Sequence, residues 1–165
     1  MQAQTAIRAV DAGHSDSSRA TARLVIAGCC VAMMAALIGG VGVPGHMVLR
    51  HIVQTLPLSI AVILAFRRSQ ATGWAGLPVF VFWLILMSFI WLYLLGVSHM
   101  LSGNFSILEI AMTVVVGVAC VIGIGAFTRL RSALSVVSRV GIFIAMGAVQ
   151  FACFRISFLP AIAHR

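Results

Sequence analysis

The feature that most constrains this chain is a series of apolar runs that recur from residue 24 to residue 159 with only short polar breaks. A helix that crosses about 30 Å of hydrocarbon needs about 20 apolar residues, and its backbone polar groups must find their partners inside the protein. The sequence therefore predicts an all-α, polytopic bundle of five transmembrane spans, at residues 24–43, 49–66, 77–97, 107–127 and 133–159.

Composition leaves no room for a soluble domain beside the spans. Hydrophobic residues make up 62% of the 165 residues and charged residues only 8%, whereas soluble domains carry about 25% charged residues. The polar stretch 1–23 shows no apolar periodicity, and we expect a flexible cytoplasmic tail there. Residues 24–165 form the predicted bundle. The first apolar run is longer than the core of a secretory signal, so we expect it to be kept as a span.

The second run is the weakest of the five. Arg50, His51 and Gln54 lie in its first turns, and Pro57 lies near its middle. Proline removes one backbone donor and should kink the helix there. A re-entrant hairpin is the alternative, but two consecutive arginines follow this run directly, which favours a full span.

Arginine placement sets the expected orientation, because cytoplasmic loops collect Arg and Lys. Arg50 and Arg165 fall outside if the N-terminus is inside, whereas Arg139 and Arg155 bracket the last span and can extend toward the nearer headgroups. Reversing the protein would invert this asymmetry, so we expect the N-terminus in the cytoplasm and the C-terminus outside. The arginines that then lie in cytoplasmic segments are Arg8, Arg19, Arg23, Arg67, Arg68, Arg129 and Arg131.

The charge indicates a lipid partner rather than nucleic acid. All 11 basic residues are arginine and the formal net charge is +8, but the arginines sit at the ends of apolar segments and form no clustered basic face. We expect contacts with anionic headgroups. An Arg-only chain rich in Ala, Gly and Val is typical of a GC-rich bacterial gene, so the expected location is the bacterial cytoplasmic (inner) membrane.

Small residues mark faces on which helices can pack closely, since close backbone approach replaces the hydrophobic effect between helices in lipid. Three spans carry such residues, and we expect a tight bundle in which the aromatic third span fills gaps or faces lipid. The first span has one stripe with a four-residue repeat, and the fourth and fifth have pairs. These residues are Gly28, Ala32, Ala36 and Gly40; Thr113/Gly117 and Ala119/Gly123; and Gly141/Ala145 and Ala148/Ala152.

Polar residues gather at the expected outer ends of spans two, three and four, and this polar cluster is the candidate site. Ionisable groups within a membrane are costly and are functional candidates by default. The spacing of His46, Arg50 and Gln54 places them on one helix face. The whole cluster comprises His46, Arg50, His51, Gln54, His99, Asn104 and Glu109.

Glu109 has two interpretations. The sequence from Ser106 to Glu109 fits a capping box, in which the two side chains satisfy free backbone donors at a helix start. Alternatively, the carboxylate binds a proton or a substrate. We also expect spans two and four to meet at their outer ends, with an ion pair from Glu109 to Arg50 or, failing that, to Arg155.

A metal or haem site is a lesser possibility. His51 and His99 should lie at similar depth on antiparallel spans, as bis-His haem requires, and His46-Met47 and His99-Met100 pair imidazole with the thioethers that Cu(I) favours. We nevertheless expect no cofactor. The four cysteines lie in apolar runs without CxxC spacing and are interpreted as packing residues.

Three functions are compatible with these features. The chain lacks the Walker, G-x-S-x-G and H-E-x-x-H signatures, so we expect no catalytic residues. The favoured hypothesis is a non-catalytic subunit or assembly factor of a membrane complex, bound to other membrane subunits or to itself as a dimer. The alternatives are a small transporter for a proton or small anion around Glu109, and haem or copper binding through His51 and His99.

Overall fold

The computed structural model describes residues 2–97, 105–130 and 132–163, with side chains described from residue 17 to residue 162 within those ranges. This part of the chain is helical, with turns between the helices and no strand. The elements are α1 (Gln2–Ala35), η1 (Ala36–Gly42), α2 (Val48–Phe66), α3 (Thr72–Leu94), α4 (Ile107–Phe127), α5 (Val136–Ile156) and the short α6 (Pro160–Ala163).

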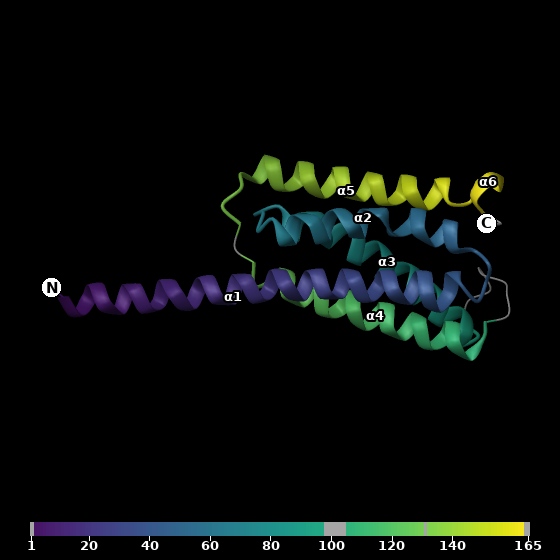
Figure 1. The fold of residues 1–165 in the computed structure, drawn as a ribbon, viewed down its shortest axis with the longest axis horizontal. Helices are drawn as coiled ribbons and strands as arrows, with labels where there is room; N and C mark the ends of the chain where they lie inside the picture. Colours follow the sequence, from purple (N-terminus) through teal and green to yellow (C-terminus); the bar gives the residue numbers. More distant parts are fainter. Residues whose placement is uncertain (1, 98–104, 131, 164–165) are drawn as a thin grey trace.

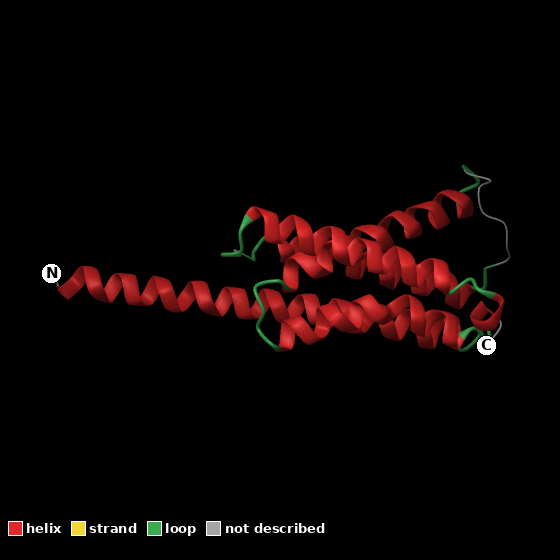
Figure 2. Cartoon of the chain, turned by 90° about the horizontal axis from the view of Figure 1, so that it is seen from above, coloured by secondary structure: helices red, strands yellow, loops and turns green. Residues whose placement is uncertain are grey.

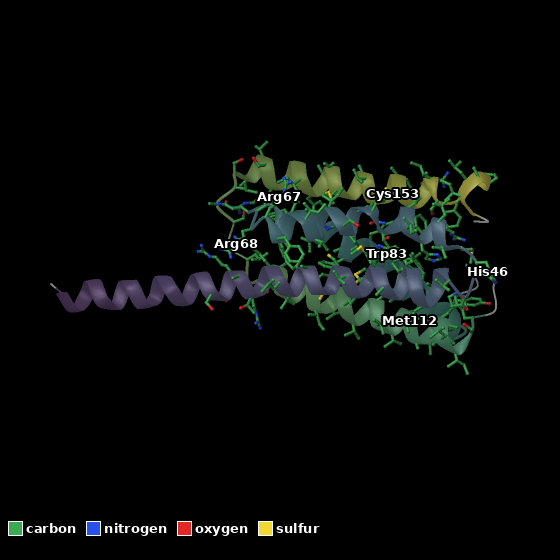
Figure 3. All side chains as sticks on the ribbon, in the orientation of Figure 1. His46, Arg67, Arg68, Trp83, Met112 and Cys153 are labelled. Atoms are coloured by element: carbon green, nitrogen blue, oxygen red, sulfur yellow. The ribbon has the colours of Figure 1, made fainter. Side chains whose placement is uncertain are left out.

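The long helices form one bundle in which consecutive helices run in opposite directions (Figure 1). Figure 3 places Arg67 and Arg68 at one end of the bundle and His46 at the other, and we call these the Arg67 end and the His46 end. Five helices of the described part are long and apolar enough to cross a membrane, with the first span running through residues 17–42. The prediction of a multi-pass membrane protein with five spans is confirmed at this level.

The helix bounds differ from the sequence prediction in three places. Residues 2–23, expected to be a flexible tail, are helical and belong to α1, whose N-terminal part extends beyond the bundle in both views (Figure 1, Figure 2). This stretch is rich in alanine and lacks proline, which favours helix. The third span begins at Thr72, where the Thr72 hydroxyl donates to the Ser69 carbonyl. The fifth is shorter than 133–159, because Ser135 caps its start by accepting from the Ser138 N–H.

The first span ends in a wide π-helical turn, η1. Hydrogen bonds from Val43 N to Ile38 O (2.9 Å) and from Met47 N to Gly42 O (2.8 Å) span five residues. The last of these, with the bond from His46 N to Val43 O, forms a Schellman motif in which His46 takes a left-handed conformation at φ 53°. Arg68 has the same role after α2, at φ 54°.

The aromatic side chains of α3 pack onto glycines of α4. A Cβ added at Gly117 would lie 2.6 Å from Cη2 of Trp91, and one at Gly123 would lie 2.6 Å from Cε2 of Phe80. Phe80 is buried in the core. The glycines of the small-residue pairs in the fourth span therefore pack against aromatic side chains of the third span. This agrees with the prediction that these aromatic side chains fill gaps in the bundle.

Sulfur-containing side chains fill the core between α1 and α4. Cys30 and Cys120 are buried, and Cys120 Sγ lies 3.8 Å from Met33 Sδ. Near the His46 end, Met112 of α4 covers Gly40 so closely that no side chain would fit there. Of the small-residue stripe expected on the first span, only the part that lies in η1 packs closely against another helix.

The fifth span is the least covered helix of the bundle. Only 11% of its apolar stretch is buried, against 28–44% in the other four spans. It contacts α2 and α3 along one side, where Gly147 faces Pro78 and Phe82 packs on Phe154 at 5.2 Å between ring centroids. Its small residues, expected inside a tight bundle, instead point outward: Gly141, Ala145, Ala148 and Ala152 are all exposed.

Candidate functional site

The predicted polar cluster falls partly outside the described residues. His99 and Asn104 are not among the described residues. His46, Arg50, His51 and Gln54 lie in or just before α2, at the His46 end, and Glu109 begins α4 at the same end. The structure thus brings the described members to one end of the bundle, where most of them make hydrogen bonds to neighbouring protein groups.

Glu109 is a helix cap. Its carboxylate accepts from the Ser106 backbone N–H at 2.8 Å and from the Ser106 hydroxyl at 2.9 Å, while the Glu109 N–H donates to Ser106 Oγ at 3.2 Å. The predicted capping box is confirmed. Both bonds to the carboxylate end on its Oε2, and a serine rather than an arginine is the partner in the described structure.

The expected ion pair between Arg50 and Glu109 is replaced by other contacts. The guanidinium carbon of Arg50 lies 4.0 Å from the centroid of the Phe158 ring, and its Nη1 donates to Met47 Sδ at 3.4 Å. The prediction was wrong because η1 lies between α2 and α4: Gly40 faces Met112 on one side and Gly42 faces His51 on the other. The two spans therefore do not meet as expected at their ends.

His51 is buried and bound within its own helix. Its Nδ1 lies 2.9 Å from the Met47 carbonyl oxygen. Since His99 lies outside the described residues, the proposed histidine pair is not placed. Among the described residues, no group of three or more His, Cys, Asp or Glu side chains could hold a metal ion.

Gln54 is the cluster member that makes hydrogen bonds to another helix. Its Nε2 donates to the Ser157 hydroxyl at 2.8 Å, and Ser157 in turn donates to the Phe154 carbonyl at 2.7 Å. Gln150 Nε2 donates to the Gln54 carbonyl at 3.4 Å. This link fastens α5 to α2, one turn before the proline of α2.

Sequence reasoning missed Gln150 and Ser157. Gln150 is fully buried, and its Oε1 has no hydrogen-bond partner in the described structure. The sequence feature that could have revealed Gln150 is an amide in the middle of an apolar run, because a polar side chain at membrane depth is expected to face another helix. The inward side of α5 therefore centres on Gln150, and the opposite side of the helix is left open.

The open side of α5 is the second candidate site, and we call it the α5 outer face. It consists of Gly141, Ala145, Ala148 and Ala152, spaced by four, three and four residues, so that they form one stripe along the helix. Arg155 is exposed three residues beyond, on the same side. A smooth apolar stripe that ends in a cation is suited to bind another helix.

Comparison with known proteins gives no family for this arrangement. No family model matches the chain, and neither a curated protein nor a solved structure matches it.

Proposed function

We propose that this protein is a non-catalytic subunit or assembly factor of a membrane complex, and that the α5 outer face binds a transmembrane helix of another membrane protein. The observation that carries the proposal is the outward position of four small residues on the least covered span. Small residues let helix backbones approach closely, and such contacts drive helix association in lipid.

The polar cluster supports a structural role over transport. The Glu109 carboxylate is engaged by Ser106, and Arg50 stacks on Phe158. A proton or anion carrier needs a group that exchanges its partner with the ligand, whereas these groups hold helix ends in place. Gln54 likewise fastens α5 to α2 and so fixes the direction of the α5 outer face.

Charge favours a different protein over a second copy as the partner. A twofold dimer places the same patch of both chains together, so the exposed Arg155 of each copy would approach the other. A partner helix with a carboxylate or a polar side chain at that depth would satisfy the guanidinium instead.

The same proposal includes the orientation. The Arg67 end carries Arg19, Arg23, Arg67, Arg68 and Arg129 near the helix ends, and the bias of arginine toward the cytoplasm supports an inner N-terminus. Arg155 and the partner group that satisfies its guanidinium would then lie near the outer surface of a bacterial inner membrane.

Affinity purification tests the function. The tagged chain is extracted from native membranes in mild detergent, and co-purified membrane proteins are quantified by mass spectrometry for wild type, Ala148→Leu and Gly141→Leu. A leucine on the stripe separates the helices, and an overpacked contact of this kind weakens binding about tenfold. We expect one partner to be lost in both variants.

Gly28→Leu is the matched control, because Gly28 of α1 is as open as Gly141, with nothing within 4 Å of an added Cβ. Equal loss of the partner in the control would contradict the assignment to α5. Recovery of the chain alone, or only with copies of itself, would contradict the subunit proposal.

A further inference from the structure

A groove runs along the outside of the bundle between α1 and α4. The part nearer the middle of the bundle is lined almost wholly by apolar side chains, and Gly28 and Ala32 line it on the α1 side. Opposite them stand Val115, Val118 and Ile122 of α4. This open part of α1 carries the members of the expected small-residue stripe that do not pack closely within the chain.

The groove continues toward the Arg67 end and becomes polar there. A second hollow shares Val25 and Ile122 with the first and extends to Ser18, Thr21 and Arg129. The Arg129 and Ser18 side chains are exposed. The two hollows thus form one groove with an apolar interior and a cationic mouth, which we call the α1–α4 groove.

The length of the α1–α4 groove fits one leaflet of a bilayer. From Ser18 to Ala32 the helix rises by 14 residues, or about 21 Å. Half of a 30 Å hydrocarbon core plus one headgroup layer of about 5–7 Å gives nearly the same length. Beyond Ala32 the groove closes, because Met112 covers Gly40. A partner helix would need a face along the whole membrane, whereas a lipid of one leaflet needs only this part.

Charge decides which lipid fits. No carboxylate lines the α1–α4 groove in the described structure, and the guanidinium of Arg129 at its mouth is suited to bind a phosphate through two parallel hydrogen bonds. We propose that the groove binds one anionic phospholipid from the leaflet at the Arg67 end. Its acyl chain lies against Gly28 and Ala32, and its phosphate lies on Arg129.

Native mass spectrometry of the purified, delipidated chain tests this site. The protein is titrated with phosphatidylglycerol and with phosphatidylcholine that carries the same acyl chains, so that only the headgroup charge differs. We expect tighter binding of phosphatidylglycerol. Arg129→Gln removes one cation near the phosphate and should lower that preference about fivefold. Gly28→Leu places a side chain in the groove and should abolish high-affinity binding of the lipid.

Two controls separate the site from ordinary lipid contact. Arg67→Gln removes an exposed arginine at the same end, and Gly141→Leu adds the same side chain to an equally open glycine on α5. Both should bind lipid as wild type does. Equal losses in Arg129→Gln and Arg67→Gln, or equal binding of both lipids, would overturn the proposal.

The position of the acyl chain gives a second readout. Phosphatidylglycerol with a photoreactive diazirine in its acyl chain should label residues 25–32 of α1 and 114–122 of α4. Labelling spread evenly over α5 would overturn the proposed site, as would displacement of the lipid by a second copy of the chain. Loss of lipid in Gly28→Leu and loss of a protein partner in Gly141→Leu are independent outcomes, so this proposal and the proposed function can fail separately.

Discussion

Replacing Gly123 by alanine should destabilise the bundle, although glycine to alanine usually stabilises a helix. An added Cβ would lie 2.6 Å from both Cε2 and Cζ of Phe80, a buried residue that is only 1% exposed. Overpacking of this kind costs about 1–3 kcal/mol, and the gain in helix propensity is at most about 1 kcal/mol. We expect the free energy of unfolding to fall by about 1–2 kcal/mol.

Gly125 supplies the matched control on the same helix. An added Cβ there would meet nothing within 4 Å, so Gly125→Ala should gain about 0.5–1 kcal/mol from helix propensity alone. The assay is equilibrium unfolding in mixed micelles of dodecyl sulfate and a mild detergent, followed by tryptophan fluorescence. If Gly123→Ala is as stable as Gly125→Ala, the packing of Phe80 of α3 on Gly123 of α4 is refuted.

The same unfolding assay checks three further predictions. His46→Gly should raise the free energy of unfolding by about 1 kcal/mol, because glycine adopts the left-handed conformation without strain. His46→Ala keeps the strain and should not raise it. Equal increases in the two variants would contradict the left-handed cap at His46. Glu109→Ala should lower the free energy of unfolding by about 1 kcal/mol. Glu109→Gln should change it by only about a few tenths of a kcal/mol, because glutamine also completes a capping box. A large decrease in Glu109→Gln would indicate a role for the charge. Phe158→Leu should lower the free energy of unfolding by about 0.5–1 kcal/mol, because it removes the Arg50 stack and the edge-to-face contact with Phe154. An equal loss in Phe151→Leu, an exposed phenylalanine of α5, would argue against a contribution from these contacts.

The spans were predictable because the length of an apolar run is a local property of the sequence. The capping box was predictable for the same reason, since Ser106 and Glu109 are three residues apart and need no other helix. The helical state of residues 2–23 was not predicted because this stretch has no apolar periodicity, and only its composition, rich in alanine and without proline, favours a helix there.

Contacts between helices were harder to predict. The Arg50–Glu109 pair assumed that opposite charges at one membrane depth meet, but the π-turn of η1 places Gly40 and Gly42 between them. Nothing in the sequence marks a π-helix. The partner of Arg50 is instead Phe158, which follows α5 and was regarded as part of an apolar span.

The small residues of α5 show a different limit. Their spacing indicates a packing face, but the sequence does not say whether the partner is within the chain. Burial of Gln150 on one side of α5 decides this, because the stripe on the other side then faces outward. The buried amide was the available signal for the direction in which α5 faces.

Photo-crosslinking in native membranes tests the central claim most directly. A photoreactive amino acid is placed at Ala148 on the α5 outer face and, as a control, at Val121 of α4, which is 59% exposed. The subunit proposal predicts a discrete crosslink from position 148 to a different membrane protein, and only lipid adducts from position 121. Lipid adducts alone at both positions, or crosslinks from position 148 only to a second copy of this chain, would contradict it.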